Sequence, residues 1–354
     1  MQFRWKVLLF TGYKMSRFRT VPLPALLLVL LPLLLTAGCA AHRGDLSSSL
    51  RSVRFTAPQG GPELLAVYQP WFGTKEHINV GYSSQDRVVL ERQLEQAKNL
   101  GISGFVVNWY GFRKEYTDRS YALMQQLAAA NDFHVAIQYD EAVDYPGHTT
   151  EAVIQDLQYA YDRYMGPQAP GSAAYLRYDG RPMIFIFPKI NQTDWNRVRQ
   201  VTQGWQDPPL LIMKDIDEQY ANDFDGFYAW INPGAAGWQA NGSNWGEDYL
   251  QNFYSRMSRY PDKIAVGAAW PGFDDRRASW TLHRYMDARC GRTFEDSLRL
   301  FRRYYDREHP LPFLLVETWN DYEEGTAIES GINTCNGKND GQRNAALLSS
   351  PAGK

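Results

Sequence analysis

Short apolar or aromatic runs alternate with stretches of helical period from Leu64 to Glu329, a pattern typical of strand–helix units around a parallel sheet. The runs are almost continuously apolar, as expected of parallel strands that helices cover on the outside. Eight such runs are present, the number that closes a (β/α)8 barrel. They are Leu64–Trp71, Gly104–Tyr110, His134–Asp140, Pro182–Phe187, Leu210–Lys214, Gly226–Ile231, Lys263–Ala269 and Phe313–Trp319.

The predicted fold class is therefore α/β, a (β/α)8 TIM barrel. Helices are expected at Asp86–Leu100, Arg119–Ala130, Thr150–Met165, Asp194–Thr202, Asn244–Tyr260 and Phe294–Asp306. An open doubly wound sheet is the alternative, and it is disfavoured because no G-x-G-x-x-G turn follows the first run. The 354 residues exceed the roughly 250 of one barrel and leave room only for short extensions.

The N-terminal segment is predicted to be a signal peptide, residues 1–38. Its uncharged run Val21–Leu35 is shorter than the roughly 20 residues that span a bilayer. The following Thr-Ala-Gly-Cys resembles a bacterial lipobox, which makes Cys39 the site of lipid attachment. Plain secretory cleavage is the alternative, and either Met1 or Met15 is the start. We expect a membrane partner through this lipid anchor, in the bacterial cell envelope, at the periplasmic or surface face of the outer membrane.

The remaining chain divides into three parts on composition. Residues 39–62 are small and polar and predict a tether, 63–335 the folded domain, and 336–354 a disordered tail. The domain keeps two cysteines, Cys290 and Cys335, and an oxidising compartment permits them to pair. A disulfide and two free thiols remain equal alternatives at this point, because sequence gives no distance between them.

Charge and aromatic content indicate which class of molecule the protein binds. Residues 1–38 hold five Arg or Lys and no acidic residue, so their removal takes the formal charge from −2 to −7. Nucleic acids are bound mainly through clustered Lys and Arg, so we expect no nucleic-acid partner. The chain has 11 Trp and 22 Tyr, whose flat faces and polar tips suit sugar rings. A polysaccharide or oligosaccharide is the expected partner.

Polar and aromatic side chains follow several predicted strands, where a barrel places its chemistry. Five aromatic residues are candidate platforms on which a sugar ring can stack: Trp71, Trp109, Tyr110, Trp230 and Trp270. Each of them alone is typical of a core residue, but we do not expect all five to lie in the core. Asp140 ends the third run and is expected to bind substrate hydroxyls. Asn320 is expected to orient a carboxylate or to bind a hydroxyl. The predicted substrate-binding residues are Tyr68, Trp71, Asn108, Trp109, Tyr110, Tyr139, Asp140, Trp230, Trp270 and Asn320.

The stretch after the last run, Thr318–Thr326, carries two carboxylates three residues apart, Asp321 and Glu324. Hydrolysis of an acetal needs one group to protonate the leaving oxygen and a second to act as base or nucleophile, so these two are the predicted catalytic pair. Gly325 permits a sharp turn directly after them. A solvated acidic loop is the alternative that the spacing alone leaves open.

Three segments carry a family resemblance. Asn320–Glu329 resembles the Asn-Glu-Trp-x-Glu-Gly-Thr-x-Ile-Glu stretch of glycoside hydrolase family 99, and Trp319–Tyr322 also resembles family 71. Tyr68–Gly73 is similar to a Tyr-Pro-Trp-Tyr-Gly motif, and Gln93–Tyr110 to the pattern that leads into the second strand. This sequence has Asp321 where family 99 has Glu, and Glu323 where it usually has His.

The resemblance implies an endo-acting glycosidase on an α-linked polysaccharide: α-mannan, α-glucan or an exopolysaccharide. It gives Asp321 the task of deprotonating the sugar 2-hydroxyl and Glu324 that of acid and base. Retention and inversion both stay open, because the separation of the two carboxyls decides between them. No cofactor and no metal site are expected, since the six His show no paired metal-ligand spacing. The rival interpretation is a catalytically silent glycan-binding barrel in polysaccharide synthesis or export.

Overall fold

The structure is a computed structural model that describes residues 61–141, 149–189, 193–231, 245–305, 311–333 and 335. All of them belong to one compact unit, Ser52–Lys354. The predicted signal peptide, Cys39, the tether up to residue 60 and the tail from residue 336 lie outside the described residues. Of the described helices, none has both the length and the apolar character that crossing a membrane requires.

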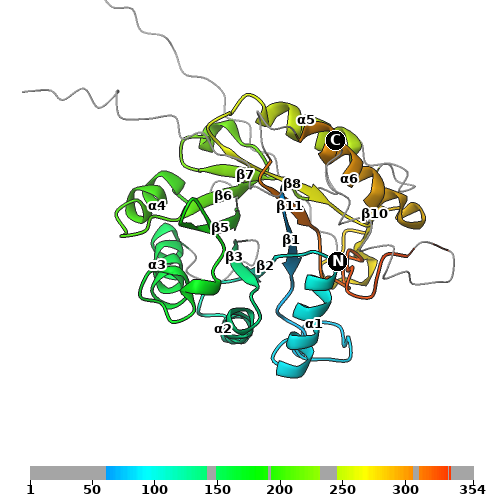
Figure 1. The fold of residues 1–354 in the computed structure, drawn as a ribbon, viewed down its shortest axis with the longest axis horizontal. Coiled ribbons are helices and arrows are strands. Elements are labelled where there is room, and N and C mark those ends of the chain that lie inside the picture. Colours follow the sequence, from blue (N-terminus) through cyan, green and yellow to red (C-terminus); the bar gives the residue numbers. More distant parts are fainter. Residues whose placement is uncertain are drawn as a thin grey trace, which may run out of the picture. The chain divides into compact units, whose positions relative to one another are not determined.

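Eight parallel strands close into a barrel. Their order around it is β3-β2-β1-β11-β8-β7-β6-β5, and pairing of β3 with β5 completes the ring. The predicted (β/α)8 fold is confirmed, with helices placed around the strands in Figure 1. The barrel strands are β1 Glu63–Tyr68, β2 Gly104–Trp109, β3 His134–Asp140, β5 Arg181–Phe187, β6 Leu210–Lys214, β7 Gly226–Tyr228, β8 Ile264–Ala269 and β11 Phe313–Val316.

Six α-helices accompany the strands within the described ranges. They are α1 Arg87–Asn99, α2 Glu115–Ala130, α3 Thr150–Ala160, α4 Trp195–Thr202, α5 Glu247–Met257 and α6 Arg292–Tyr304. Three short strands lie outside the barrel: β4 Arg177–Tyr178, β9 Phe273–Asp274 and β10 Tyr285–Met286.

Side-chain caps explain where several helices begin. The Asp86 carboxylate accepts from the backbone N–H groups of Val88 and Val89, Thr149 caps α3, and Asp194 caps α4. Such caps satisfy donors that a first helical turn leaves unpaired. Between β6 and β7 the described chain forms only a 3-10 turn, Glu218–Tyr220, in place of a full helix.

The strands alternate their side chains between the barrel interior and the helices. Inside, Gln138 of β3 donates from Nε2 to the Tyr228 hydroxyl of β7 over 3.0 Å, and Phe185 packs edge-on to Tyr228. Outside, Trp109 donates from Nε1 to Asp118 of α2 over 3.0 Å. This period of two decides which residue at each strand end can reach the barrel mouth.

A disulfide joins Cys290, just before α6, to Cys335 near the end of the described chain. Their Cα atoms are 5.0 Å apart, within the usual range for a bridge. The pairing links the loop after β8 to the segment that follows β11. Both sides of the last barrel strand are therefore covalently tied at the mouth end.

Candidate active site

The turn after β11 is held by its own hydrogen bonds. The Thr318 N–H donates to the Thr326 carbonyl over 3.0 Å, and the Thr326 N–H donates to the Asp321 carbonyl over 3.1 Å. Gly325 has a φ of +66°, and a Cβ there would lie 3.2 Å from Cβ of Asp274. The turn therefore fixes the backbone on which Asp321 and Glu324 stand.

Asp321 is buried, and each of its carboxylate oxygens has donors. Oδ1 accepts the backbone N–H groups of Glu323 and Glu324 over 3.1 and 2.9 Å. Oδ2 accepts Nε2 of Gln69, the residue after β1, over 3.1 Å. The Gln69 Oε1 in turn accepts Nδ2 of Asn108 at the end of β2. A chain of amide donors thus orients this carboxyl from two neighbouring strands.

Burial raises the pKa of Asp321 well above its usual value, and the negative charge of Glu324 raises it further. The N–H donors from the turn oppose both effects because they stabilise the ionised form.

Glu324 reaches the surface of the mouth, where its side chain is 19% exposed. Its Oε1 accepts Nε1 of Trp280 over 3.1 Å, and an Arg284 nitrogen lies 4.0 Å away. Burial raises the pKa of Glu324, while Trp280, Arg284 and the Lys214 ammonium oppose the shift. A partly exposed carboxyl of raised pKa can hold a proton and still reach a bound molecule.

A buried carboxylate, Asp275, builds the loop that carries Trp280 and Arg284. It accepts from the Thr281 hydroxyl over 2.9 Å and from the Arg284 backbone and guanidinium. Burial works against its ionisation, yet these bonds with Arg284 hold its pKa below the usual range. The sequence Asp-Asp-Arg-Arg at this point suggests a solvated turn, which is wrong for the fully buried Asp275.

The loop after β1 closes over the turn from the other side. The Nδ1 of His77 lies 2.7 Å from Oε2 of Glu323, and the Ile78 N–H donates to Oε1 over 3.1 Å. The His77 ring stacks on Trp71 with centroids 4.5 Å apart, and Trp280 stands edge-on to Trp71 at 5.9 Å. Aromatic faces therefore wall the mouth beside Glu324.

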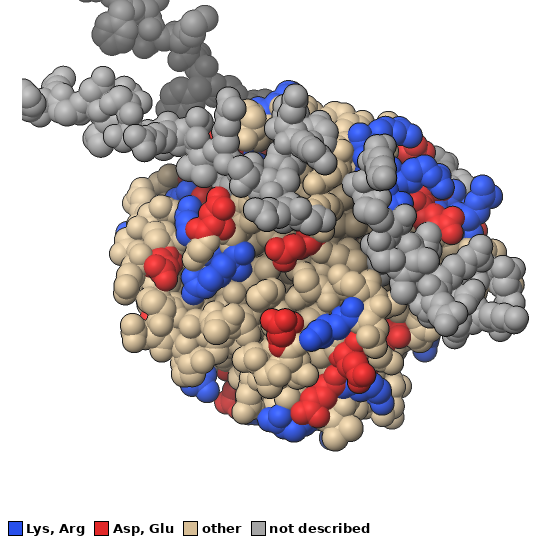
Figure 2. Space-filling view, viewed as in Figure 1, with Lys and Arg blue, Asp and Glu red and all other residues tan. Residues whose placement is uncertain are grey.

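The opposite side of the mouth is built around Lys214, at the end of β6. Its ammonium lies 3.8 Å from the ring centroid of Phe187 and experiences the charges of Asp140, Glu317 and Glu324. Burial lowers the pKa of Lys214, and these carboxyls oppose that shift. Figure 2 shows acidic and basic side chains close together over the central part of the face in view.

Glu317 lies inside the barrel mouth with no exposed surface. Its Oε2 accepts the Ile231 N–H over 2.5 Å, whereas Oε1 has no hydrogen-bond partner among the described residues. Burial raises the pKa of this carboxyl well above its usual range, and the charge of Asp215 adds to the shift. Burial therefore favours the protonated form of Glu317, whose Oε1 is buried as well.

Six of the predicted substrate-binding residues lie at the mouth: Trp71, Asn108, Tyr110, Asp140, Trp230 and Asn320. The pKa of Tyr110 is raised first by burial and then by the charges of Asp140, Asp321 and Glu324. Trp230 stands edge-on to Phe187 at 5.5 Å. Asn320 binds the Gln69 backbone N–H and carbonyl over 2.7 and 3.0 Å, so it positions the residue that orients Asp321.

The structure does not bring the other four to the mouth. The Tyr68 hydroxyl donates to Gln93 of α1, and the Tyr139 hydroxyl donates to Asp156 of α3. Trp109 is bonded to α2, as described above, because these three side chains project from the outer face of their strands. Trp270 is fully buried, and its Nε1 donates to the Trp245 carbonyl over 3.0 Å.

Other mouth residues escaped the sequence reasoning: His77, Lys214 and Trp280, with Arg284 beside them. His77 and Trp280 come from long loops with no strand pattern to mark them. Lys214 is the last residue of a predicted strand, so its position at a strand end was an available signal. No group of three or more His, Cys, Asp or Glu within the described ranges is arranged to hold a metal ion.

A closed (β/α)8 barrel with paired carboxyls and aromatic walls at its mouth is an architecture that glycosidases share with other barrel enzymes. A sequence comparison makes this specific: the model of glycosyl hydrolase family 99 matches residues 73–339, most of the chain. The chain belongs to glycosyl hydrolase family 99. The resemblance noted in the sequence is thereby confirmed.

Curated relatives and solved structures agree with this assignment. The glycoprotein endo-alpha-1,2-mannosidase of Mus musculus is 21% identical over 274 residues, which cover 71% of this chain and 55% of that protein. That of Rattus norvegicus is 22% identical over 275 residues. The chain spans about half the length of these curated relatives.

Among solved structures, the GH99 endo-alpha-mannosidase from Bacteroides thetaiotaomicron aligns with a TM-score of 0.64 and 17% identity, over 83% of this chain and 97% of that one. A glycoside hydrolase-like protein aligns with a TM-score of 0.54 and 13% identity, over 81% and 93%. At these identities both structures support the barrel fold.

Proposed function

We propose that this protein is an endo-acting glycoside hydrolase that cleaves an α-linked polysaccharide with Asp321 and Glu324. One observation carries the proposal: a single rigid turn presents both carboxyls at the barrel mouth, and the pKa of each is raised. Membership of family 99 supports it, as do relatives named as endo-α-mannosidases. The candidate substrates are α-mannan, α-glucan and an exopolysaccharide.

Glu324 is proposed as the acid and base. Its raised pKa favours the protonated form, and its partial exposure lets it reach the oxygen of a scissile bond. Once it has donated the proton, Trp280 and Arg284 stabilise the carboxylate that remains. The same carboxylate can then accept a proton from an attacking water.

Asp321 is proposed to act on the sugar 2-hydroxyl. Its surroundings raise the pKa, so its ionised form binds a proton more strongly than an ordinary Asp. Gln69 and the two backbone donors fix its orientation toward one place in the mouth. Positioning of this kind converts a weak base into an effective one.

The remaining mouth residues are proposed to bind the sugar. Trp71 and Trp280 offer aromatic edges and faces on one side, and Trp230 on the other. Lys214 and the buried, unpartnered Oε1 of Glu317 are proposed to bond hydroxyl groups that enter the mouth. Buried polar groups of this type favour a ligand that supplies matching hydroxyls, because an unpaired partner is costly.

The test uses the purified full chain with α-mannan, α-1,3-glucan and the host's exopolysaccharide, following product size and anomeric configuration by NMR. Release of oligosaccharides is expected, and the first-formed anomer distinguishes retention from inversion. Glu324→Gln should lower the rate by about 10²–10⁴-fold, the usual contribution of general acid–base catalysis, while sparing sugar affinity. Glu115→Gln is the matched control, because Glu115 is an exposed carboxyl on α2.

A silent glycan-binding barrel is the second candidate, and one observation favours it. Asp321 is only 2% exposed and its carboxylate already accepts three N–H groups, so it offers little room for a reacting proton. Binding of the same polysaccharides without any product, unchanged by Glu324→Gln, would establish this alternative.

We also propose that residues 1–38 are removed and that Cys39 carries a lipid, which holds the protein in the bacterial cell envelope at the outer membrane. The support is the apolar run followed by Thr36-Ala37-Gly38-Cys39. Fatty-acid labelling of growing cells should mark the wild-type protein and leave Cys39→Ser unlabelled. Labelling of both proteins would contradict the proposal.

A further inference from the structure

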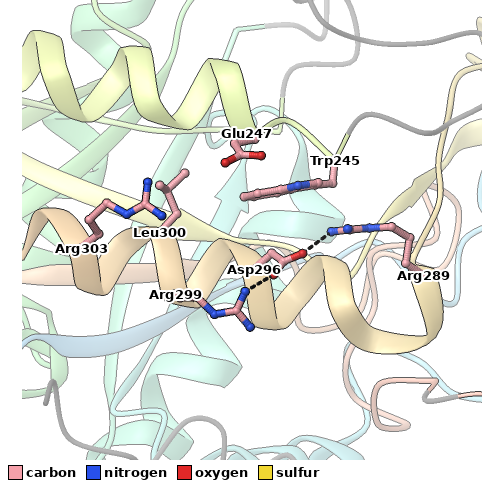
Figure 3. A pocket seen from close by; sticks show the side chains of 7 residues that line it. All are labelled: Trp245, Glu247, Arg289, Asp296, Arg299, Leu300 and Arg303. Carbon is pink, nitrogen blue, oxygen red and sulfur yellow. Dashed lines mark hydrogen bonds and ion pairs between the residues drawn. The ribbon is translucent and has the colours of Figure 1, made fainter.

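A second concave site lies between α5 and α6. It is a pocket of about 240 Å³. Figure 3 shows Trp245 and Glu247 on the α5 side and the other side chains along α6 and the turn before it. Four charged side chains complete the lining with Leu300: Arg289, Asp296, Arg299 and Arg303.

Arg289 is held in place by an unusual backbone. It has a φ of +49°, in the left-handed region that few residues other than Gly adopt, and the Asp287 carboxylate accepts its N–H over 2.8 Å. Its guanidinium bonds Asp296 over 2.8 Å and lies 5.7 Å from the Trp245 ring centroid. The neighbouring Cys290 is in the disulfide, which ties this turn to the segment after β11.

The charges around the pocket do not cancel. Asp296 pairs with both Arg289 and Arg299, while Arg303 has no ion-pair partner within the described part of the chain. Three arginines face two carboxylates, Glu247 and Asp296, which leaves one positive charge. In Figure 2, basic and acidic side chains lie next to one another in the region where Figure 1 places α6.

A helix macrodipole accounts for basic residues in the last turn of α6, where Arg303 stands. It does not account for Trp245 and Arg289, which reach the same pocket from two different loops. Convergence of an indole, a fixed guanidinium and an unpaired one indicates a ligand with both an apolar face and a negative charge.

We propose that this pocket binds a uronate, a sugar residue that bears one carboxylate, within a polysaccharide chain. The single excess positive charge matches a monoanion, and guanidinium groups bind carboxylates through paired N–H donors. Trp245, which is partly exposed, offers apolar surface to a sugar ring. The volume is below the roughly 300–1,000 Å³ of sites for drug-sized ligands, which suits one sugar residue. A phosphate dianion fits less well because Glu247 and Asp296 repel it.

The pocket and the barrel mouth share the start of α5. Glu247 lines the pocket, and Tyr249, half a turn further on, donates its hydroxyl to Asp215 beside Lys214. The Trp245 carbonyl accepts the Nε1–H of Trp270, and this bond fixes Trp245, two positions before Glu247, as well. The two places thus adjoin opposite faces of the same helix, and the inference rests on the proposed function in that its ligand is a glycan.

The test is calorimetric titration of the full chain with oligomers of galacturonic acid, with the same oligomers methyl-esterified, and with inorganic phosphate. The acid oligomers should bind, weaken as salt rises, and lose most of their affinity on esterification. Arg303→Ala and Trp245→Ala should each weaken binding about tenfold or more, because a bond to a charged partner and an aromatic face are removed. Arg292→Ala is the matched control, since Arg292 also lies on α6 but does not line the pocket.

Glu247→Gln gives a change of opposite sign. It removes a negative charge from the lining, so uronate binding should tighten severalfold, a result that a merely damaged fold would not produce. Equal affinity for esterified oligomers, equal weakening by Arg292→Ala, or phosphate binding with the same dependence on Arg303 would overturn the proposal.

Binding is measured in Glu324→Gln as well, so that the two proposals fail separately. Retained uronate affinity in that variant is expected whether or not the wild-type chain hydrolyses any polysaccharide. Loss of the pocket's binding with hydrolysis intact would remove this inference and leave the proposed function standing.

Discussion

The bond from Trp280 to Glu324 offers the sharpest test of the proposed acid. Trp280→Phe keeps an aromatic ring beside Trp71 but removes the Nε1–H that Glu324 Oε1 accepts over 3.1 Å. Because that bond stabilises the ionised carboxylate, its removal must raise the pKa of Glu324 further.

The size of the shift follows from exposure. A hydrogen bond to a charged group contributes about 1.5–3 kcal/mol when both partners are buried. Trp280 is 39% exposed and the Glu324 side chain 19%, so water replaces part of the bond and about 1 kcal/mol remains. At 1.36 kcal/mol per unit, the pKa of Glu324 should rise by about 0.7.

Two measurements can detect this rise. In the pH dependence of kcat/KM, the alkaline limb reports loss of the proton from the general acid and should move to higher pH. The carboxyl carbon resonance of Glu324 should titrate at higher pH by the same amount, whatever the substrate. Leu282→Ala, an exposed change in the same loop, is the control. An unmoved limb and an unmoved resonance, or a shift to lower pH, would refute the assignment.

Three further predictions concern stability. Burial raises the pKa of Glu317 above the unfolded value of about 4.3, so wild-type stability falls as pH rises above that value. Glu317→Gln should therefore raise the midpoint of urea unfolding at pH 8 but not at pH 4. A difference between mutant and wild type that stays constant with pH would contradict this. Asp275→Asn should cost about 2 kcal/mol in urea unfolding, less than a fully buried pair because Arg284 is 25% exposed. Reduction of the Cys290–Cys335 bridge, which spans 45 residues, should lower stability by up to about 4 kcal/mol, visible as a lower melting temperature with dithiothreitol; an unchanged melt would disprove it.

The strands were the most predictable part of the fold, because each is a compact apolar run bounded by turn residues. Their ends were less so: the run Gly226–Ile231 continues past the last ladder residue, Tyr228, since Ala229–Ile231 stay buried without pairing in a strand. Helix α2 begins at Glu115 and not at Arg119, because its N-cap, Lys114, makes no side-chain capping bond that sequence could reveal.

The candidate catalytic pair was predictable from a motif, whereas the walls of the mouth were not. Parallel strands are apolar on both faces, so the sequence does not show which of two neighbouring residues faces inward. This is why Trp109 and Tyr110 had equal claims, although Trp109 is bonded to α2 and the mouth carboxyls raise the pKa of Tyr110. His77 and Trp280 depend on loop conformations set by the buried partners Glu323 and Asp275.

The candidate site is held together by hydrogen bonds between residues that follow the first barrel strand, β1, and residues that follow the last, β11. Gln69 bonds Asn320 and Asp321 at sequence separations of 251 and 252, and His77 meets Glu323 at 246. Contacts so distant in sequence form late, because the intervening chain loses its conformational entropy before these contacts can stabilise the fold. During synthesis the barrel has no oriented Asp321 until its final strand has emerged and paired with its first. Recovery of the proposed hydrolysis after refolding should therefore follow the pairing of the first and last strands, separately from the earlier appearance of helical structure.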